Sequence, residues 1–185
     1  MKNKTDLYID NLHANLKNLF ILSPFYYFLA YYFLLDNSSN YFSIINTFVL
    51  LLIQNIFYHY AHQYMHNILS IRWMHDFHHK YIETTPTIGN AVSMAEYQIA
   101  YVLPFMIGSF IVHPSPVDLQ VTVFIISSLN MLIHSQELKE MKYLSFLVSP
   151  MKHIGHHETR SGTYSAPLFD LDNILKMKFL KKSYE

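Results

Sequence analysis

The chain lacks cysteine and is poor in charged residues. With no cysteine among its 185 residues it can form no disulfide, thiolate ligand or iron–sulfur cluster, so histidine and carboxylate remain as metal ligands. Charged residues make up 14% of the chain and hydrophobic residues 51%, whereas about 25% of the residues of an ordinary soluble domain are charged. The formal net charge is zero and the basic residues form no stripe, which argues against a nucleic-acid partner. The shortage of charge predicts a membrane protein.

Four apolar stretches predict membrane-spanning helices. We expect the spans near residues 19–35, 41–60, 95–112 and 117–133. The second and fourth approach the roughly 20 residues that a spanning helix requires, whereas the third is short. Turn-forming residues separate the members of each pair. The sequence therefore predicts a single all-α membrane domain over residues 1–185 with about four transmembrane helices in two hairpins. A soluble protein with buried core helices is the alternative.

The distribution of basic residues predicts the orientation in the membrane. All thirteen lysines and arginines lie before the first span, between the second and third, or after the fourth. By the positive-inside rule, both termini and every histidine cluster are then cytoplasmic. This orientation suits a bacterial inner membrane or the endoplasmic reticulum. No small-residue cleavage site follows the first stretch, so we expect it to remain in the mature chain rather than act as a signal peptide.

Eight of the twelve histidines form three short clusters. The clusters are His62 with His66, His75 with His78 and His79, and His153 with His156 and His157. Spacings of three and four residues place side chains on one face of a helix. Because neutral imidazole is the commonest metal ligand in proteins, the clusters predict a metal site in a helical cap over residues 59–90 and 134–175. Chance clustering, or loose metal binding at the surface, is the alternative.

The remaining histidines are single. His134 ends the fourth apolar stretch beside the expected cap, so we include it among the ligands. His59 lies on the same helical stripe as His62 and is either a further ligand or a residue behind the ligands. His13 and His113 should lie far from the site. Nine ligands exceed the four that saturate zinc and the six of an octahedral ion, which implies two metal ions.

Residues 55 to about 172 resemble the fatty acid hydroxylase and sterol desaturase superfamily of membrane di-iron proteins. The resemblance rests on five elements in order: His62-Gln-Tyr-Met-His66 as the HxxxH box, residues 73–80 as the HxxHH box, Thr85-Pro-Thr87 with the later Glu96, residues 133–135 as the third histidine element, and residues 149–157 as the last box. The match covers about two thirds of the chain.

The resemblance implies an O2-dependent oxidoreductase that hydroxylates or desaturates a C–H bond of a fatty-acyl, sterol or other lipid. Two iron ions would be held by the nine histidines, although zinc could replace iron on isolation, and no catalytic residue is expected beyond the ligands. The chain has no glycine-rich dinucleotide fingerprint, so electrons should come from a separate cytochrome b5-like or ferredoxin-like carrier. Glu96 is the preferred acceptor for a ligand imidazole, ahead of Glu137, Glu158 and Asp172.

Departures from the family pattern leave other functions open. Gln63 stands where many relatives have arginine, residues 163–165 replace a common asparagine–aromatic–glycine triplet, and Leu171-Asp172 replaces a tryptophan–aspartate pair. An inactive or repurposed member, such as a non-catalytic zinc-binding membrane protein, is one alternative. A metal transporter is another, but transport requires polar ligands near the middle of the bilayer, and these spans contain almost no ionisable groups.

Overall fold

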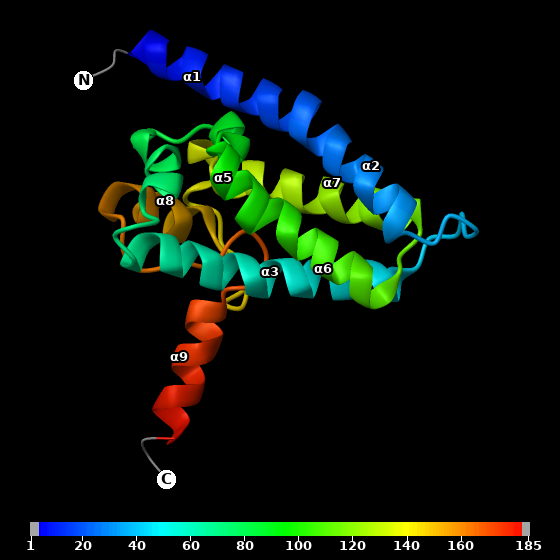
Figure 1. The fold of residues 1–185 in the computed structure, drawn as a ribbon. Helices are drawn as coiled ribbons and strands as arrows, with labels where there is room; N and C mark the ends of the chain where they lie inside the picture. Colours follow the sequence, from blue (N-terminus) through cyan, green and yellow to red (C-terminus); the bar gives the residue numbers. More distant parts are fainter. Residues whose placement is uncertain (1–3, 183–185) are drawn as a thin grey trace.

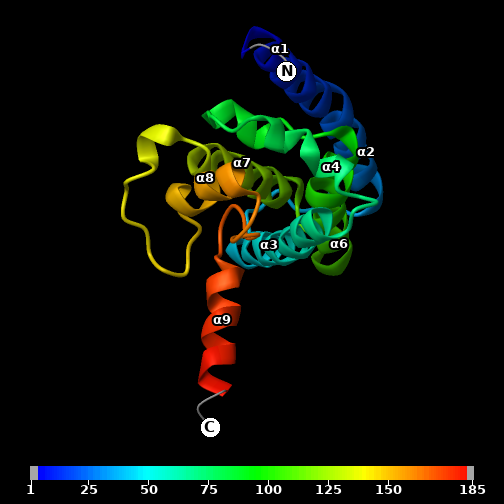
Figure 2. The same cartoon turned by 90° about the vertical axis from the view of Figure 1, so that its left-hand side faces the viewer.

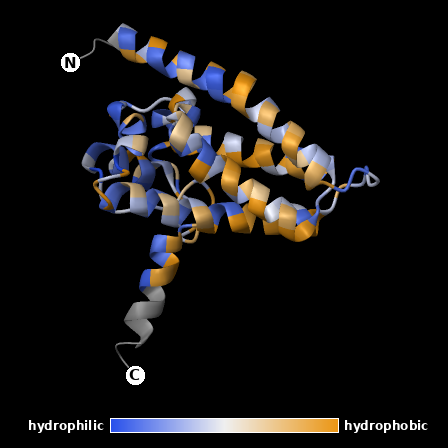
Figure 3. Ribbon diagram, viewed as in Figure 1, coloured by the Kyte–Doolittle hydropathy of each residue, from blue (hydrophilic) through white to orange (hydrophobic). Residues whose placement is uncertain are grey.

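The computed structural model describes residues 4–182 (Figure 1). Within this range every regular element is helical, and the only strand-like pairing among the described residues is an isolated backbone bridge between Leu147 and Phe169. The all-α prediction is therefore confirmed. Hydropathy divides the molecule: apolar residues dominate the helical layer, and polar residues gather at one end of it (Figure 3).

Three helical stretches in the described part of the chain are long and apolar enough to cross a membrane: Ile44–Asn67, Met94–Val112 and Pro116–Ile133. The first is helix α3 (Ile44–Asn67) and the last is α7 (Pro116–Ile133), while the middle stretch ends in α6 (Leu103–Val112). Large apolar side chains such as Phe48, Phe110 and Phe124 point outward and are exposed, as expected for surfaces that face lipid.

The first predicted span differs from the other three. Its residues continue a helix that begins in the polar α1 (Lys4–Lys17), passes through a π-helical segment (Asn18–Leu22) and ends in α2 (Ser23–Phe33). This long helix lies at an angle to α3 (Figures 1 and 2). It does not meet the length and hydropathy of the other spans. The first span, the total of four spans and the pairing into two hairpins therefore remain predictions.

Asp118 joins the starts of α3 and α7. Its carboxylate accepts the backbone N–H of Ser43, which caps α3, at 2.6 Å, and it forms a capping box with Ser115 at the start of α7. At the opposite ends of these helices, Met65 and Ile133 share one buried cluster. The two helices therefore run in the same direction, and their C-terminal ends meet at the polar end of the molecule.

Two π-helical segments each precede a proline. Asn18–Leu22 lies before Pro24, and Tyr97–Val102 lies before Pro104 in α6. Proline has no N–H to donate to the carbonyl four residues earlier, and its ring displaces that carbonyl, so the preceding turn widens. The start of α2 and the start of the second π-helical segment meet, with Ser23 Oγ and Tyr97 OH 2.5 Å apart.

Short elements build the polar end. They are α4 (Trp73–Asp76), 3-10 turns at His78–Lys80, Pro86–Asn90 and Gln136–Leu138, α5 (Met94–Glu96) and α8 (Pro150–Thr159). Figure 2 looks onto this end and shows α4 and α8 beside the ends of α3 and α7. The last helix, α9 (Leu171–Lys182), leaves the bundle (Figure 1).

Candidate metal centre

The first and third histidine clusters lie on helices, as their spacing predicts, whereas the second does not lie on a single helix. His62 and His66 occupy the last two turns of α3, and His134 caps the C-terminal end of α7. The second cluster divides between α4 and the following 3-10 turn. The third lies on α8, which begins at Pro150 after an N-cap by Ser149.

The structure brings all nine proposed ligands together in two groups. The five-histidine group contains His62, His66, His75, His79 and His156, and the four-histidine group contains His78, His134, His153 and His157. Within each group the ring nitrogens that could bind a metal lie within 4.8 Å of one another. Eight of the nine side chains are buried, and His66 alone of these nine is partly exposed.

In the five-histidine group, backbone carbonyls fix the protonation of two rings. His62 Nδ1 donates to the Tyr164 oxygen at 2.7 Å, and His156 Nδ1 donates to the Ser161 oxygen at 3.3 Å. A carbonyl can only accept, so each neutral ring carries its proton on Nδ1 and a lone pair on Nε2. The two Nε2 atoms nevertheless lie 3.1 Å apart. Facing lone pairs repel unless a cation lies between them, so this group fits a metal ion.

The four-histidine group repeats the arrangement. His134 Nδ1 donates to the Asn130 oxygen at 2.6 Å, and His157 Nδ1 donates to the Tyr81 oxygen at 3.2 Å. Their Nε2 lone pairs face each other at 3.2 Å, and His153 Nε2 lies 3.0 Å from His134 Nε2. Hydrogen bonds from the distal ring nitrogen orient metal-binding imidazoles in known metal sites. The second group therefore also fits a metal ion.

Burial keeps these imidazoles neutral at physiological pH. Removal from water lowers the pKa of His78, His134 and His156 to about 4. It also holds the pKa of His153 and His157 well below the usual range, with neighbouring histidines adding to the effect. A neutral imidazole is the form that binds a metal.

We expect the metal-free protein to lose stability as the pH falls from about 6.5 to about 4. In this window the unfolded chain takes up protons at 6.5, while folded His78, His134 and His156 resist them until about 4. The free energy of unfolding therefore decreases with decreasing pH. Thermal unfolding in detergent after chelation measures the effect. Metal-loaded protein, the control, should be more stable throughout, and its loss should start at the same pH but continue below about 4, because bound metal keeps the folded imidazoles unprotonated. A flat profile for the metal-free protein would contradict the prediction.

Glu96 is the acidic residue that contacts a proposed ligand most directly. Its backbone N–H is capped by Ser93, and its fully buried Oε1 lies 2.7 Å from His75 Nδ1. Since a carboxylate accepts, His75 Nδ1 donates and its buried Nε2, which has no hydrogen-bond partner among the described residues, is left for a metal. The preference for Glu96 from sequence agrees with this contact.

The other acidic candidates lie elsewhere. Asp172 accepts the backbone N–H groups of Tyr164 and Ser165, both at 2.8 Å, and so holds the loop whose carbonyl orients a ligand. Glu158 pairs with Lys139 at 3.3 Å, and Glu137 is exposed.

The remaining histidines divide as the sequence suggests. His59 Nδ1 lies 3.1 Å from Ser165 Oγ and belongs to neither group, so its place is behind the ligands. His13 is exposed on α1. His113 contacts the Leu34 oxygen in the turn before α7, at the end of the spans away from the other histidines.

Asn130 and Gly89 support the site and carry no signal in the sequence. The side-chain Nδ2 of Asn130 donates to the backbone oxygen of Gly89 at 2.6 Å. The backbone oxygen of Asn130 accepts from His134 Nδ1. A Cβ at position 89 would lie 2.8 Å from that Asn130 oxygen and 3.1 Å from His134 Nδ1. Gly89 therefore lets the loop reach the end of α7 closely enough to fix His134. Neither role follows from spacing, because both depend on backbone contacts across about 40 residues.

Replacement of Gly89 by alanine should displace His134. We expect Gly89→Ala to lower the free energy of unfolding by about 1–3 kcal/mol through overpacking, and to weaken metal retention in the four-histidine group. Metal content after dialysis against a weak chelator, with thermal unfolding, measures both effects. Gly155→Ala is the matched control, since a Cβ there would meet nothing within 4 Å. Equal behaviour of the two variants would contradict this role for Gly89.

The fold and the site define a helical membrane protein with two adjoining groups of buried histidines at one end of its spans. A family model described as fatty acid hydroxylase matches residues 47–176, and the chain belongs to this family. The matched residues contain all nine grouped histidines and exclude α1 and α2. Comparisons with curated proteins and with solved structures gave no match. Together with the three apolar helices, membership in this family indicates an integral membrane protein.

Proposed function

We propose that this protein is a di-iron oxidoreductase that hydroxylates or desaturates a lipid, using O2 and electrons from a separate carrier. Family membership supports the general class of lipid hydroxylase or desaturase. The observation that carries the proposal is the pair of histidine groups in which protonated Nδ1 atoms leave Nε2 lone pairs facing one another. Iron bound there would supply the redox chemistry that an unactivated C–H bond requires and that acid–base side chains lack.

The role of the protein residues is to hold the ligands rigidly. Glu96 keeps a proton on His75 Nδ1 and thereby fixes the ring that it orients. Backbone carbonyls do the same for five further rings, those of His62, His78, His134, His156 and His157. These six rings are therefore oriented before metal binds. Burial of eight of the nine ligands excludes water from the centre and so suppresses side reactions.

A small cavity supports docking of an electron carrier at the exposed edge of the centre. It has a volume of about 160 Å³ and borders His66, His75 and His79. Arg72, Arg160 and Asp76 also line it, and Arg160 pairs with Asp76 at 3.3 Å, so a net positive charge remains on this exposed edge. This net positive charge suits a carrier with an acidic docking face, as expected for a cytochrome b5-like or ferredoxin-like protein. In our proposal this edge, together with both termini, faces the cytoplasm.

Anaerobic purification with metal analysis, followed by lipid profiling, tests the proposed function. We expect about two iron ions per chain, and a cellular lipid that gains one oxygen or loses two hydrogens when the protein is expressed. A His78→Ala, His156→Ala variant should produce neither change, because it removes one ligand from each group.

Two outcomes would replace the proposal. Retention of zinc in iron-supplemented cells, with a lipid profile equal to that of the double variant, would indicate a non-catalytic metalloprotein. Metal uptake into vesicles would indicate transport, although the grouped histidines lie at the end of the spans.

A further inference from the structure

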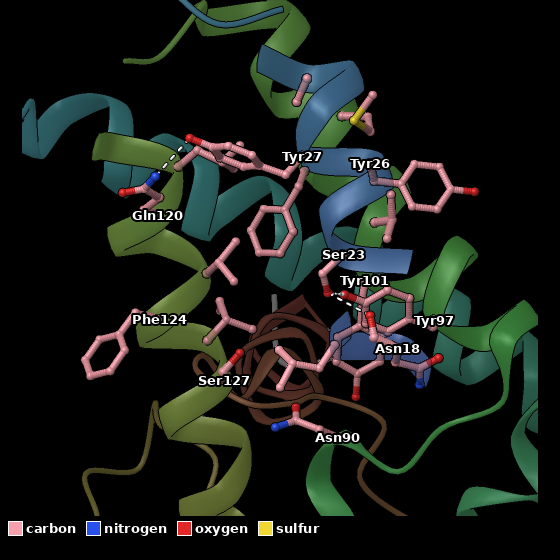
Figure 4. Close-up of a pocket in the computed structure, with 18 of the residues that line it drawn as sticks. Asn18, Ser23, Tyr26, Tyr27, Asn90, Tyr97, Tyr101, Gln120, Phe124 and Ser127 are labelled. Carbon is pink, nitrogen blue, oxygen red and sulfur yellow. Dashed lines mark hydrogen bonds between the residues drawn. The ribbon is translucent and has the colours of Figure 1, made fainter. Parts of the chain in front are cut away.

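A second, larger cavity lies within the layer of apolar helices. Its volume is about 480 Å³, and α2, α6 and α7 with the two π-helical segments form its walls (Figure 4). This volume lies in the usual range for small-molecule sites. Leu19 and Phe124 line the cavity and are also exposed on the apolar surface, so the cavity is open to a ligand that arrives from the bilayer.

The two ends of the cavity are polar and its middle is apolar. At one end Gln120 donates to Tyr27 OH at 2.9 Å, and at the other lie Asn18, Ser23 and Tyr97 (Figure 4). Apolar side chains from α6 and α7 line the middle. If each methylene group takes about 30 Å³, the volume of one water-sized group, the cavity holds about sixteen carbons. It therefore accommodates one long alkyl chain but not two. The shape therefore suits a single-chain amphiphile.

Asn18 carries an unpaired acceptor at the polar end. Its side chain is only 3% exposed, and its Nδ2 donates to the Val92 oxygen at 3.0 Å. Because that carbonyl can only accept, the orientation of the amide is fixed and the acceptor is Oδ1. Oδ1 has no hydrogen-bond partner among the described residues. Buried acceptors of this kind are rare, and this one calls for a donor from a ligand.

The lining of the cavity selects against a charged ligand. None of the described residues that line it is lysine, arginine, histidine, aspartate or glutamate. An ionised carboxylate or phosphate would enter without a partner, which burial penalises strongly. The ligand should therefore be neutral and should carry a hydroxyl or amide N–H.

We propose that this cavity binds a neutral single-chain lipid whose hydroxyl or amide N–H donates to Asn18 Oδ1, with its alkyl chain directed towards Tyr27 and Gln120. The donor end lies nearer the metal centre, because Asn18 contacts Val92 and the adjacent Ala91 oxygen accepts from His78 Nδ1. Identification of this lipid as the substrate rests on the proposed function, whereas its binding does not. Asn18 precedes the residues that match the family, so this selectivity belongs to the N-terminal helix of this chain.

Competition binding to the purified full chain in detergent tests the proposal. Tritiated hexadecanol is the probe, and the competitors are unlabelled hexadecanol, hexadecanamide, methyl hexadecanoate and ionised hexadecanoate. We expect the alcohol and the amide to compete at least about tenfold better than the methyl ester, which leaves Asn18 Oδ1 unpaired. Ionised hexadecanoate should be weakest. Equal competition by the alcohol and the ester in the parent protein would overturn the proposal without any variant.

Three variants locate the effect. Asn18→Leu should remove the preference for alcohol over ester, and Ala30→Trp should abolish all binding because Ala30 is a buried wall of the cavity. Asn37→Leu is the matched control, since it is the same change at an asparagine outside the cavity. Its Nδ2 also donates to a backbone oxygen, that of Tyr31, at 2.6 Å, but the residue is exposed. It should keep the parent's preference.

The outcomes separate this proposal from the proposed function. Normal binding to Ala30→Trp, or an undiminished preference in Asn18→Leu, would overturn the lipid site. If Asn18→Leu does not fold, the parent's competition series and Ala30→Trp still decide. Selective binding by a protein that makes no oxidised lipid would count against the oxidoreductase alone. Lipid oxidation by a protein that binds alcohol and ester equally would count against Asn18 alone.

Discussion

The variant His134→Ala should retain about one iron ion per chain in place of about two. Its activity should fall by more than about a hundredfold, because replacing a residue that only orients a ligand already costs up to about a hundredfold. His134 is central to its group: its Nε2 lies 3.2 Å from the Nε2 atoms of His78 and His157 and 3.0 Å from that of His153. Its removal leaves three ligands with an open side. Iron content by mass spectrometry and the yield of oxidised lipid measure the two effects.

The reciprocal variant and a surface control complete the experiment. His62→Ala should empty the five-histidine group instead, because its Nε2 lies 3.1 Å from those of both His66 and His156. His13→Ala should change neither iron nor activity, since His13 is exposed on α1. Equal loss in His13→Ala, or full iron retention in both ligand variants, would refute the assignment of the two groups.

The spacing of the histidines predicts their helices but not their division into groups. Each HxxHH box appears in the sequence as one cluster. In the structure His78 belongs to one group and His79 to the other, and His156 and His157 divide in the same way. Adjacent residues on a helical turn point roughly 100–120° apart, so a pair of consecutive histidines faces two centres. Which centre each one faces depends on tertiary packing.

The supporting residues were harder to predict than the ligands. Glu96 is predicted through the resemblance to the family, which places an acidic residue after the threonine–proline element. The carbonyls of Tyr164, Asn130 and Tyr81 have no counterpart in composition or spacing, since every residue type has a carbonyl. Their positions arise only when the loops fold against α3 and α7. The first apolar stretch was equally ambiguous, because the sequence gives its hydropathy but not the angle at which it packs.

Glu96→Gln should lower activity by about 10–100-fold while the protein still folds. In the parent protein His75 Nδ1 lies 2.7 Å from Glu96 Oε1. The amide of glutamine has the shape of the carboxylate and can accept through its oxygen, but it is a weaker hydrogen-bond acceptor than the charged carboxylate. His75 then becomes a poorer donor to the metal. Because Glu96 is fully buried, a flipped amide would place an NH2 group against His75 and favour the wrong tautomer.

A readout other than activity separates positioning of His75 from general stability. Iron should dissociate faster from Glu96→Gln than from the parent during timed chelation, with an unfolding temperature of the metal-free protein close to that of the parent. Glu96→Ala should be more severe on both measures, since it leaves a cavity and an unoriented ring. Glu137→Gln, a change of the same kind at an exposed carboxylate, should match the parent throughout. If iron leaves the parent and Glu96→Gln at the same rate, Glu96 contributes only to folding, and the hydrogen bond to His75 does not tune the centre.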